Sequence, residues 1–141
     1  MRVRFMLLLC CMAAALPAVA QDSLPDPRTF WLDEAQEQLA TVHISYRSLV
    51  ARATTGDTVA LSNLITLHGL DGAGAEVHAE VLWALLCRWG DQVFSALLRK
   101  TAREVRLRAV CNLDFAAPSE WFARFPKTYR SARHQASCRG W

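Results

Sequence analysis

Several familiar catalytic and metal-binding patterns are missing from the sequence. It contains no Cys-x-x-Cys and no His-Glu-x-x-His, which excludes two common zinc-binding arrangements. It contains no Gly-x-Ser-x-Gly and no glycine-rich loop followed by Lys-Ser or Lys-Thr, which excludes a serine-hydrolase elbow and a phosphate-binding loop. His43, His68 and His134 each stand alone. We therefore predict no catalytic residue, no metal site and no cofactor.

Alternating runs of β-branched residues are also missing, so the sequence predicts no sheet. Apolar residues instead recur every three or four positions, as in helices with one buried face. The first such pattern runs from Phe30 to about Ala53, and later ones follow Asp57, Ala75, Asp91, Thr101 and Pro118. The predicted fold is all-α: a small helical bundle or short α-solenoid of helix hairpins.

Local signals predict where these helices begin. Asp57 follows Gly56, so one helix should end there and the aspartate should cap the next. Gly90 precedes a second restart of the apolar pattern. Thr101 is followed three residues later by Glu104, which is the spacing of a capping box.

The apolar run at the N-terminus, residues 5–16, is too short to span a bilayer. Arg2 and Arg4 precede it, and the small-x-small sequence at residues 18–20 follows it, as in a secretory signal peptide. We predict a signal peptide at residues 1–20 and a mature chain with no membrane segment.

After cleavage, two prolines and a lack of periodicity make residues 21–28 a mobile leader. Residues 29–141 are long enough for one helical domain. Only Lys100 and Lys127 are lysines, and an arginine-rich chain with such a signal is typical of a high-GC bacterium. The predicted destination is the periplasm, with secretion from the cell as the alternative.

Charge is unevenly distributed along the mature chain. Residues 21–87 contain three arginines and nine acids, whereas residues 88–141 contain eleven basic residues and four acids. Because the two halves nearly cancel, we expect no nucleic-acid partner. The resulting dipole favours a charged protein partner or head-to-tail contacts.

Three cysteines remain after signal cleavage: Cys87, Cys111 and Cys138. An oxidising compartment favours one disulfide and one leftover thiol. A bond from Cys138 to either Cys87 or Cys111 would close a loop of tens of residues and constrain the C-terminal tail. The remaining cysteine is either buried and inert or links two chains in a homodimer.

Two segments repeat within the chain. Residues 56–64 match residues 90–98 at an offset of 34, and residues 75–85 match residues 103–113 at an offset of 28. With its arginine-bearing helix 101–109, this pattern resembles the HEAT-like helical repeats. The resemblance implies stacked helix pairs that bind other macromolecules. The alignment also predicts one shared core, formed by Val77, Leu82, Leu85, Val105, Val110 and Leu113.

Tryptophan and arginine, which are enriched in protein interfaces, cluster between residues 88 and 108. The candidate contact surface consists of Trp89, Arg99, Arg103, Arg106 and Arg108. We predict an exported protein-binding module, such as an immunity or inhibitor protein against a toxic periplasmic enzyme. The alternatives are an envelope scaffold or adaptor, or a secreted enzyme in which Cys111 or Cys138 acts with His134.

Overall fold

The computed structural model describes residues 24–132 and Cys138. These residues form a short 3-10 turn and seven helices without a strand, which confirms the predicted all-α class. The elements are η1 (Pro27–Thr29), α1 (Asp33–Ala40), α2 (Tyr46–Thr54), α3 (Thr58–Thr66), α4 (Gly72–Leu98), α5 (Arg103–Ala116), α6 (Trp121–Arg124) and α7 (Pro126–Arg130). The predicted signal peptide and residues 21–23 lie outside the described residues.

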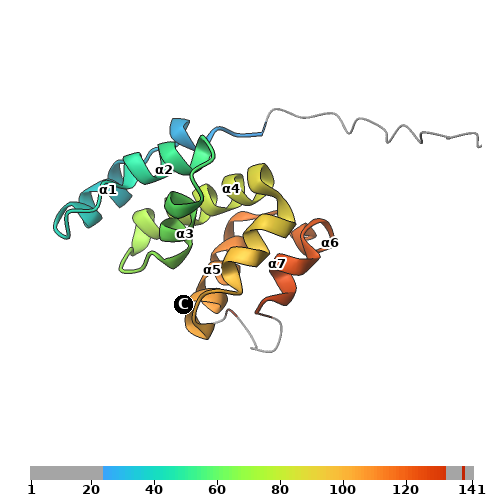
Figure 1. The fold of residues 1–141 in the computed structure, drawn as a ribbon. Helices are drawn as coiled ribbons and strands as arrows, with labels where there is room; N and C mark the ends of the chain where they lie inside the picture. Colours follow the sequence, from blue (N-terminus) through green and yellow to red (C-terminus); the bar gives the residue numbers. More distant parts are fainter. Residues whose placement is uncertain (1–23, 133–137, 139–141) are drawn as a thin grey trace, which may run out of the picture.

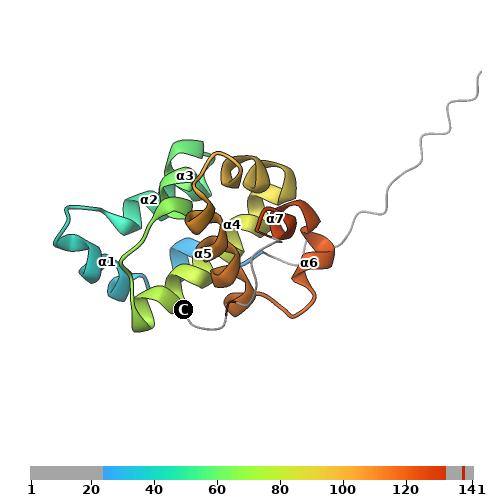
Figure 2. The ribbon, with the colours of Figure 1, turned by 90° about the horizontal axis from the view of Figure 1, so that it is seen from below.

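Helix α4 forms the centre of the molecule. In Figures 1 and 2, α1 to α3 lie on one side of it and α6 and α7 on the other, while α5 packs along it. By length and composition alone α4 is the one described helix that meets the requirement for a membrane span. Its apolar face is buried in the core, which accounts for this composition.

The core predicted from the repeat alignment is confirmed. Leu82, Leu85 and Leu113 have no exposed surface, and Val110 is 5% exposed in the same cluster. Val77 and Val105 are partly buried against that cluster. Full burial of an aliphatic side chain stabilises the fold by about 1.5–3 kcal/mol, so this cluster joins α4 to α5 firmly.

The single helix predicted from Phe30 to about Ala53 is wrong, because the chain forms α1 and α2 instead. α1 ends at Ala40, and His43, three residues later, has a positive φ of 58°, which a continuous helix does not allow. The Gln36 side chain then bridges the break: its amide donates to the Ile44 carbonyl and accepts from the Arg47 backbone N–H, at 3.3 and 3.1 Å. The Gln36 side chain thus bonds backbone groups at the break that would bond to one another in a continuous helix.

One predicted helix cap is confirmed and the other is wrong. Asp57 accepts hydrogen bonds at 2.9 and 3.0 Å from the backbone N–H groups two and three residues later. The capping box from Thr101 to Glu104 does not form. Ala102 is the N-cap of α5, and the Thr101 hydroxyl donates to the Leu98 carbonyl at 2.8 Å. Because the Thr101 hydroxyl bonds to the last turn of α4, it does not cap α5.

Gly90 divides α4 where the sequence predicted a restart. Its φ of 77° and ψ of 163° are accessible to glycine and rarely to other residues. Asp91, the next residue, accepts from the backbone N–H groups of Lys127 and Thr128 at 2.8 and 2.7 Å. A carboxylate on α4 therefore caps the first turn of α7 and fixes it to the kink.

The predicted mobile leader at residues 21–28 is ordered over its last residues. Pro27 is buried, and η1 packs against α2 and α4. The Asp26 carboxylate accepts from both the backbone and the guanidinium of Arg28, at 3.0 and 2.9 Å. These hydrogen bonds lower the pKa of Asp26 to about 2. A short capped turn thus anchors a proline-rich segment that showed no apolar periodicity.

Candidate protein-binding surface

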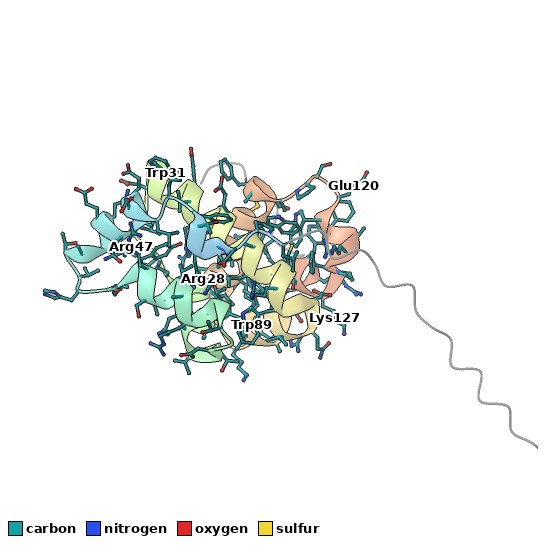
Figure 3. All side chains as sticks on the ribbon, turned by 90° about the horizontal axis from the view of Figure 1, so that it is seen from above. Arg28, Trp31, Arg47, Trp89, Glu120 and Lys127 are labelled. Atoms are coloured by element: carbon teal, nitrogen blue, oxygen red, sulfur yellow. A yellow bond between two sulfur atoms is a disulfide. The ribbon has the colours of Figure 1, made fainter. Side chains whose placement is uncertain are left out.

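Trp89 belongs to the candidate surface, but part of its side chain makes contacts within the fold. Its indole N–H donates to the Ala53 carbonyl at the end of α2, at 3.0 Å. With Arg28 and Arg88, the ring lines a hollow of about 580 Å³. Figure 3 shows Arg28 and Trp89 over the middle of the molecule. This tryptophan therefore joins α2 to α4 and offers only part of its surface to a partner.

Three of the four candidate arginines make contacts within the chain: Arg99 donates to the Ser95 hydroxyl at 3.4 Å, and the other two reach backbone carbonyl groups. The guanidinium of Arg106 donates to the Thr101 carbonyl between α4 and α5. Arg108 reaches back to the Thr66 carbonyl at the end of α3, at 3.2 Å. The Thr66 carbonyl lies at the C-terminus of α3, where a cation is favourable, whereas the Thr101 carbonyl lies in the turn before α5. Replacing either Arg106 or Arg108 would disturb the fold as well as any contact.

Arg99 and Arg103 are exposed, as is Lys100 between them. They form the basic turn that connects α4 to α5. Arg103 is the first residue of α5, where the helix dipole disfavours a cation. The structure thus reduces the candidate surface predicted from residues 88–108 to this exposed turn.

Ion pairs occur only at the acidic end of the described chain. The three pairs are Arg28 with Asp26, Arg47 with Asp33, and Arg52 with Asp57. Every arginine among residues 24–87 is therefore paired. The nine basic residues of 88–132 form no ion pair within the described chain; they are Arg88, Arg99, Lys100, Arg103, Arg106, Arg108, Arg124, Lys127 and Arg130.

The sequence analysis missed an exposed aromatic cluster on α6 and α7. Phe122 and Tyr129 are 45% and 36% exposed, and their ring centroids lie 5.5 Å apart. Tyr129 also packs edge-on against Trp121, which is buried and donates to the Asp114 carboxylate at 2.8 Å. In the sequence, the one indication of this cluster is that its two exposed aromatic residues lie seven positions apart, on either side of Pro126.

A second hollow, larger than the one beside Trp89, lies at the other end of the molecule. A groove of about 750 Å³ runs between α2, the end of α3 and the α1–α2 turn. Leu39, Ile44, Leu49 and Leu67 contribute apolar surface to it, while neutral hydroxyl and amide side chains form most of its polar lining. Its one arginine, Arg52, is already paired with Asp57.

A buried polar pair links α2 to α4 in the core. The Tyr46 hydroxyl and His78 Nδ1 are 2.9 Å apart, and Tyr46 is fully buried. Burial raises the pKa of Tyr46, and burial together with the positive charge of Arg108 lowers the pKa of His78 to about 4. His78 is therefore neutral at pH 7 and acts as a structural residue.

Cys138 pairs with Cys111 on α5, one of the two pairings that the sequence left open. The bond ties the end of the chain to the middle of α5. Cys87 is the free cysteine among the described residues; it is half-buried, and burial raises the pKa of its thiol. Its thiol is therefore largely protonated at pH 7 and weakly nucleophilic. His134, the proposed base of the cysteine enzyme, lies outside the described residues.

No protein-family model, no curated protein and no solved structure matches this chain. Among the described residues, no group of three or more His, Cys, Asp or Glu side chains is placed to hold a metal ion. A function must therefore be argued from the surface of this chain itself.

Proposed function

We propose that the mature chain, residues 21–141, is a periplasmic protein-binding module that binds and inhibits a toxic enzyme, as an immunity protein does. In this proposal the helix pairs stack in a HEAT-like manner and present a basic surface to an acidic partner. Small exported helical proteins with a rigid core suit this task, because a preorganised surface loses little conformational entropy on binding.

The supporting observation is the segregation of charge. The arginines of the acidic end are neutralised within the chain, whereas the cations of residues 88–132 have no carboxylate partner among the described residues. Unpaired charge of one sign on a folded surface speeds association with an oppositely charged surface and selects against wrong partners.

The experiment is affinity capture from periplasmic extract, with the mature chain as bait and mass spectrometry to identify the partner. One variant bait carries Arg99→Glu, Arg103→Glu, Arg124→Glu and Arg130→Glu. A matched control carries Glu34→Arg, Glu37→Arg, Glu76→Arg and Glu80→Arg at the acidic end. We expect one partner that is lost with the first variant and kept with the second.

The captured partner is then purified and assayed for enzymatic activity with and without the mature chain. We expect an equimolar amount of the mature chain to abolish the activity. A partner whose activity is unchanged by saturating amounts of the chain would contradict the inhibitor proposal, as would the capture of no protein above blank resin.

A further inference from the structure

We infer that the partner-binding surface is the exposed face of α6 and α7, and that it fits an acidic protein surface presenting apolar side chains. The α6–α7 face consists of Phe122, Arg124, Lys127, Tyr129 and Arg130. The inference rests on the proposed function and specifies where that function resides.

The centre of this face is aromatic. Phe122 and Tyr129 expose 45% and 36% of their surface and touch one another, with 5.5 Å between ring centroids. Adjacent exposed aromatic rings are costly in water and are typical of the energetic centre of a protein interface. Tyr129 is held from behind by the buried ring of Trp121, 5.6 Å away. The two rings are thus positioned before a partner arrives.

Three cations belong to the rim of this face, and among the described residues they contact only neutral groups. Lys127 Nζ lies 2.5 Å from the Gln92 side-chain oxygen, and Arg130 donates to the Pro126 carbonyl at 3.0 Å. Arg124 lies over the Phe125 ring, 5.1 Å from its centroid. These contacts orient the three charges without neutralising them, so a carboxylate on a partner is the complementary group.

The face is also anchored at both ends. Asp91 accepts two backbone hydrogen bonds from the first turn of α7, and Trp121 donates to Asp114 on α5. Preorganisation of this kind lowers the entropic cost of binding. In Figure 3, Glu120 and Lys127 lie at the opposite end of the molecule from Arg47, so the face is remote from the paired acidic end.

A protein partner fits this face better than an anionic membrane. Membrane-surface helices present a long apolar stripe, whereas α6 and α7 have four and five residues and Trp121 is buried. Glu120 and Asp114 are also exposed at this end of the molecule, so its charge is mixed, whereas membrane-surface helices carry a uniformly basic polar face. A small aromatic centre with a mixed charged rim is instead the anatomy of a protein interface.

The α4–α5 turn provides a matched surface of equal charge. Arg99, Lys100 and Arg103 are exposed, but no aromatic residue occurs between positions 99 and 114. Asp91, where α7 docks, is separated from this turn by the end of α4, roughly 12 Å at 1.5 Å per residue. Reversing three charges there alters the net charge as much as reversing three on the α6–α7 face.

The test uses the mature chain and two defined probes: poly-glutamate and a random copolymer of glutamate and tyrosine. Binding is measured by isothermal titration calorimetry at low and at physiological salt. The variants are Phe122→Ala, the triple variant Arg124→Glu, Lys127→Glu and Arg130→Glu, and the control triple Arg99→Glu, Lys100→Glu and Arg103→Glu. Circular dichroism establishes that each is folded.

We expect the tyrosine-containing copolymer to bind more tightly than poly-glutamate. Phe122→Ala, which removes an exposed ring and leaves the fold intact, should weaken copolymer binding about tenfold, as expected of an interface hot spot. The α6–α7 triple variant should abolish binding, and the control triple should change it less than about threefold. Equal loss in both triples, or no effect of Phe122→Ala, would overturn the inference.

Two further outcomes are distinguishable. Binding to phosphatidylglycerol vesicles without binding to the copolymer would overturn the protein partner in favour of a lipid surface. If the partner captured from periplasm binds the α6–α7 triple variant as well as it binds the unaltered chain, this inference fails while the proposed function stands. Failure to capture any partner defeats the proposed function itself.

Discussion

The two ends of the molecule differ in whether their basic side chains form ion pairs. Among residues 24–87, each arginine forms an ion pair, and a polar pair is sealed in the core. Among residues 88–132, the cations form no ion pair within the described chain, and the rings of Phe115, Phe122 and Tyr129 are exposed. The first region pairs each of its arginines within the chain, whereas the second has cations without an ion pair among the described residues and exposed aromatic rings.

This difference is not a difference in stability. The C-terminal region contains the disulfide, the Asp91 cap on α7 and the Trp121 hydrogen bond to Asp114. The unpaired cations and exposed rings are thus carried by the more heavily cross-linked part of the described chain. Holding such groups on a rigid frame reduces the conformational entropy lost on association.

Helix α4 belongs to both regions, so a cavity within it should unfold them together. We expect Leu82→Ala to lower the free energy of unfolding by about 2–5 kcal/mol, because Leu82 is fully buried. Urea denaturation followed by circular dichroism measures the loss, with Val59→Ala on the surface as the control. Two separate transitions, or retention of full stability, would show that α4 does not join the regions.

The disulfide should stabilise the C-terminal region only, because both of its cysteines lie there. It closes a loop with a sequence separation of 27, which corresponds to about 3.5 kcal/mol in the chain-entropy model. We expect Cys138→Ser to destabilise the chain by about that amount and to make it insensitive to reductant. The Cys87→Ser variant should still be destabilised by reductant. If that variant no longer responds to reductant, the disulfide involves Cys87 instead.

Acid should act first on the N-terminal region. The pKa of His78 is lowered to about 4, below the value of about 6.5 expected in the unfolded chain. The unfolded chain therefore takes up a proton first, and stability falls as the pH drops from about 6.5 to 4, by up to about 3 kcal/mol. Asp26 and Asp57 have lowered pKa values, so their protonation destabilises at lower pH.

The measurement is urea unfolding at several pH values, for the unaltered chain and for His78→Leu. We expect the variant to lose the slope between pH 6.5 and 4. A slope of the same size in both proteins would assign the acid sensitivity to groups other than the buried imidazole.

Loss of the Asp91 cap should have the smallest effect and should be local to α7. Asp91→Ala removes two hydrogen bonds to backbone N–H groups and should cost about 1–2 kcal/mol. Hydrogen exchange should increase in α7 before α1. Glu34→Ala, which removes an exposed acid at the other end, should change stability by less than about 0.5 kcal/mol. Equal protection of α7 in both variants would contradict the cap.

The fold class and the core were predictable because they depend on spacing alone. Apolar residues at helical intervals identified the helices, and the internal match placed Leu82, Leu85, Val110 and Leu113 in one core. The kink at Gly90 and the cap by Asp57 depend only on neighbouring residues in the sequence, so they were predictable as well.

Features that depend on distant partners were not predictable. The break after α1 depends on the Gln36 side chain reaching the start of α2, and the failed capping box depends on Thr101 bonding back to α4. The roles of Arg106 and Arg108 required knowing which carbonyl groups they meet. The exposed pair Phe122 and Tyr129 was hidden because exposure is a property of the packed structure.

The most direct test of the functional contrast is a residue-resolved binding map. Backbone amide spectra of the isotope-labelled mature chain would be recorded during titration with the copolymer of glutamate and tyrosine. The account predicts that chemical-shift changes concentrate in residues 121–130, with little change in α1 to α3. Changes centred on the 750 Å³ groove of α2 and α3, or spread evenly over every basic residue, would contradict it.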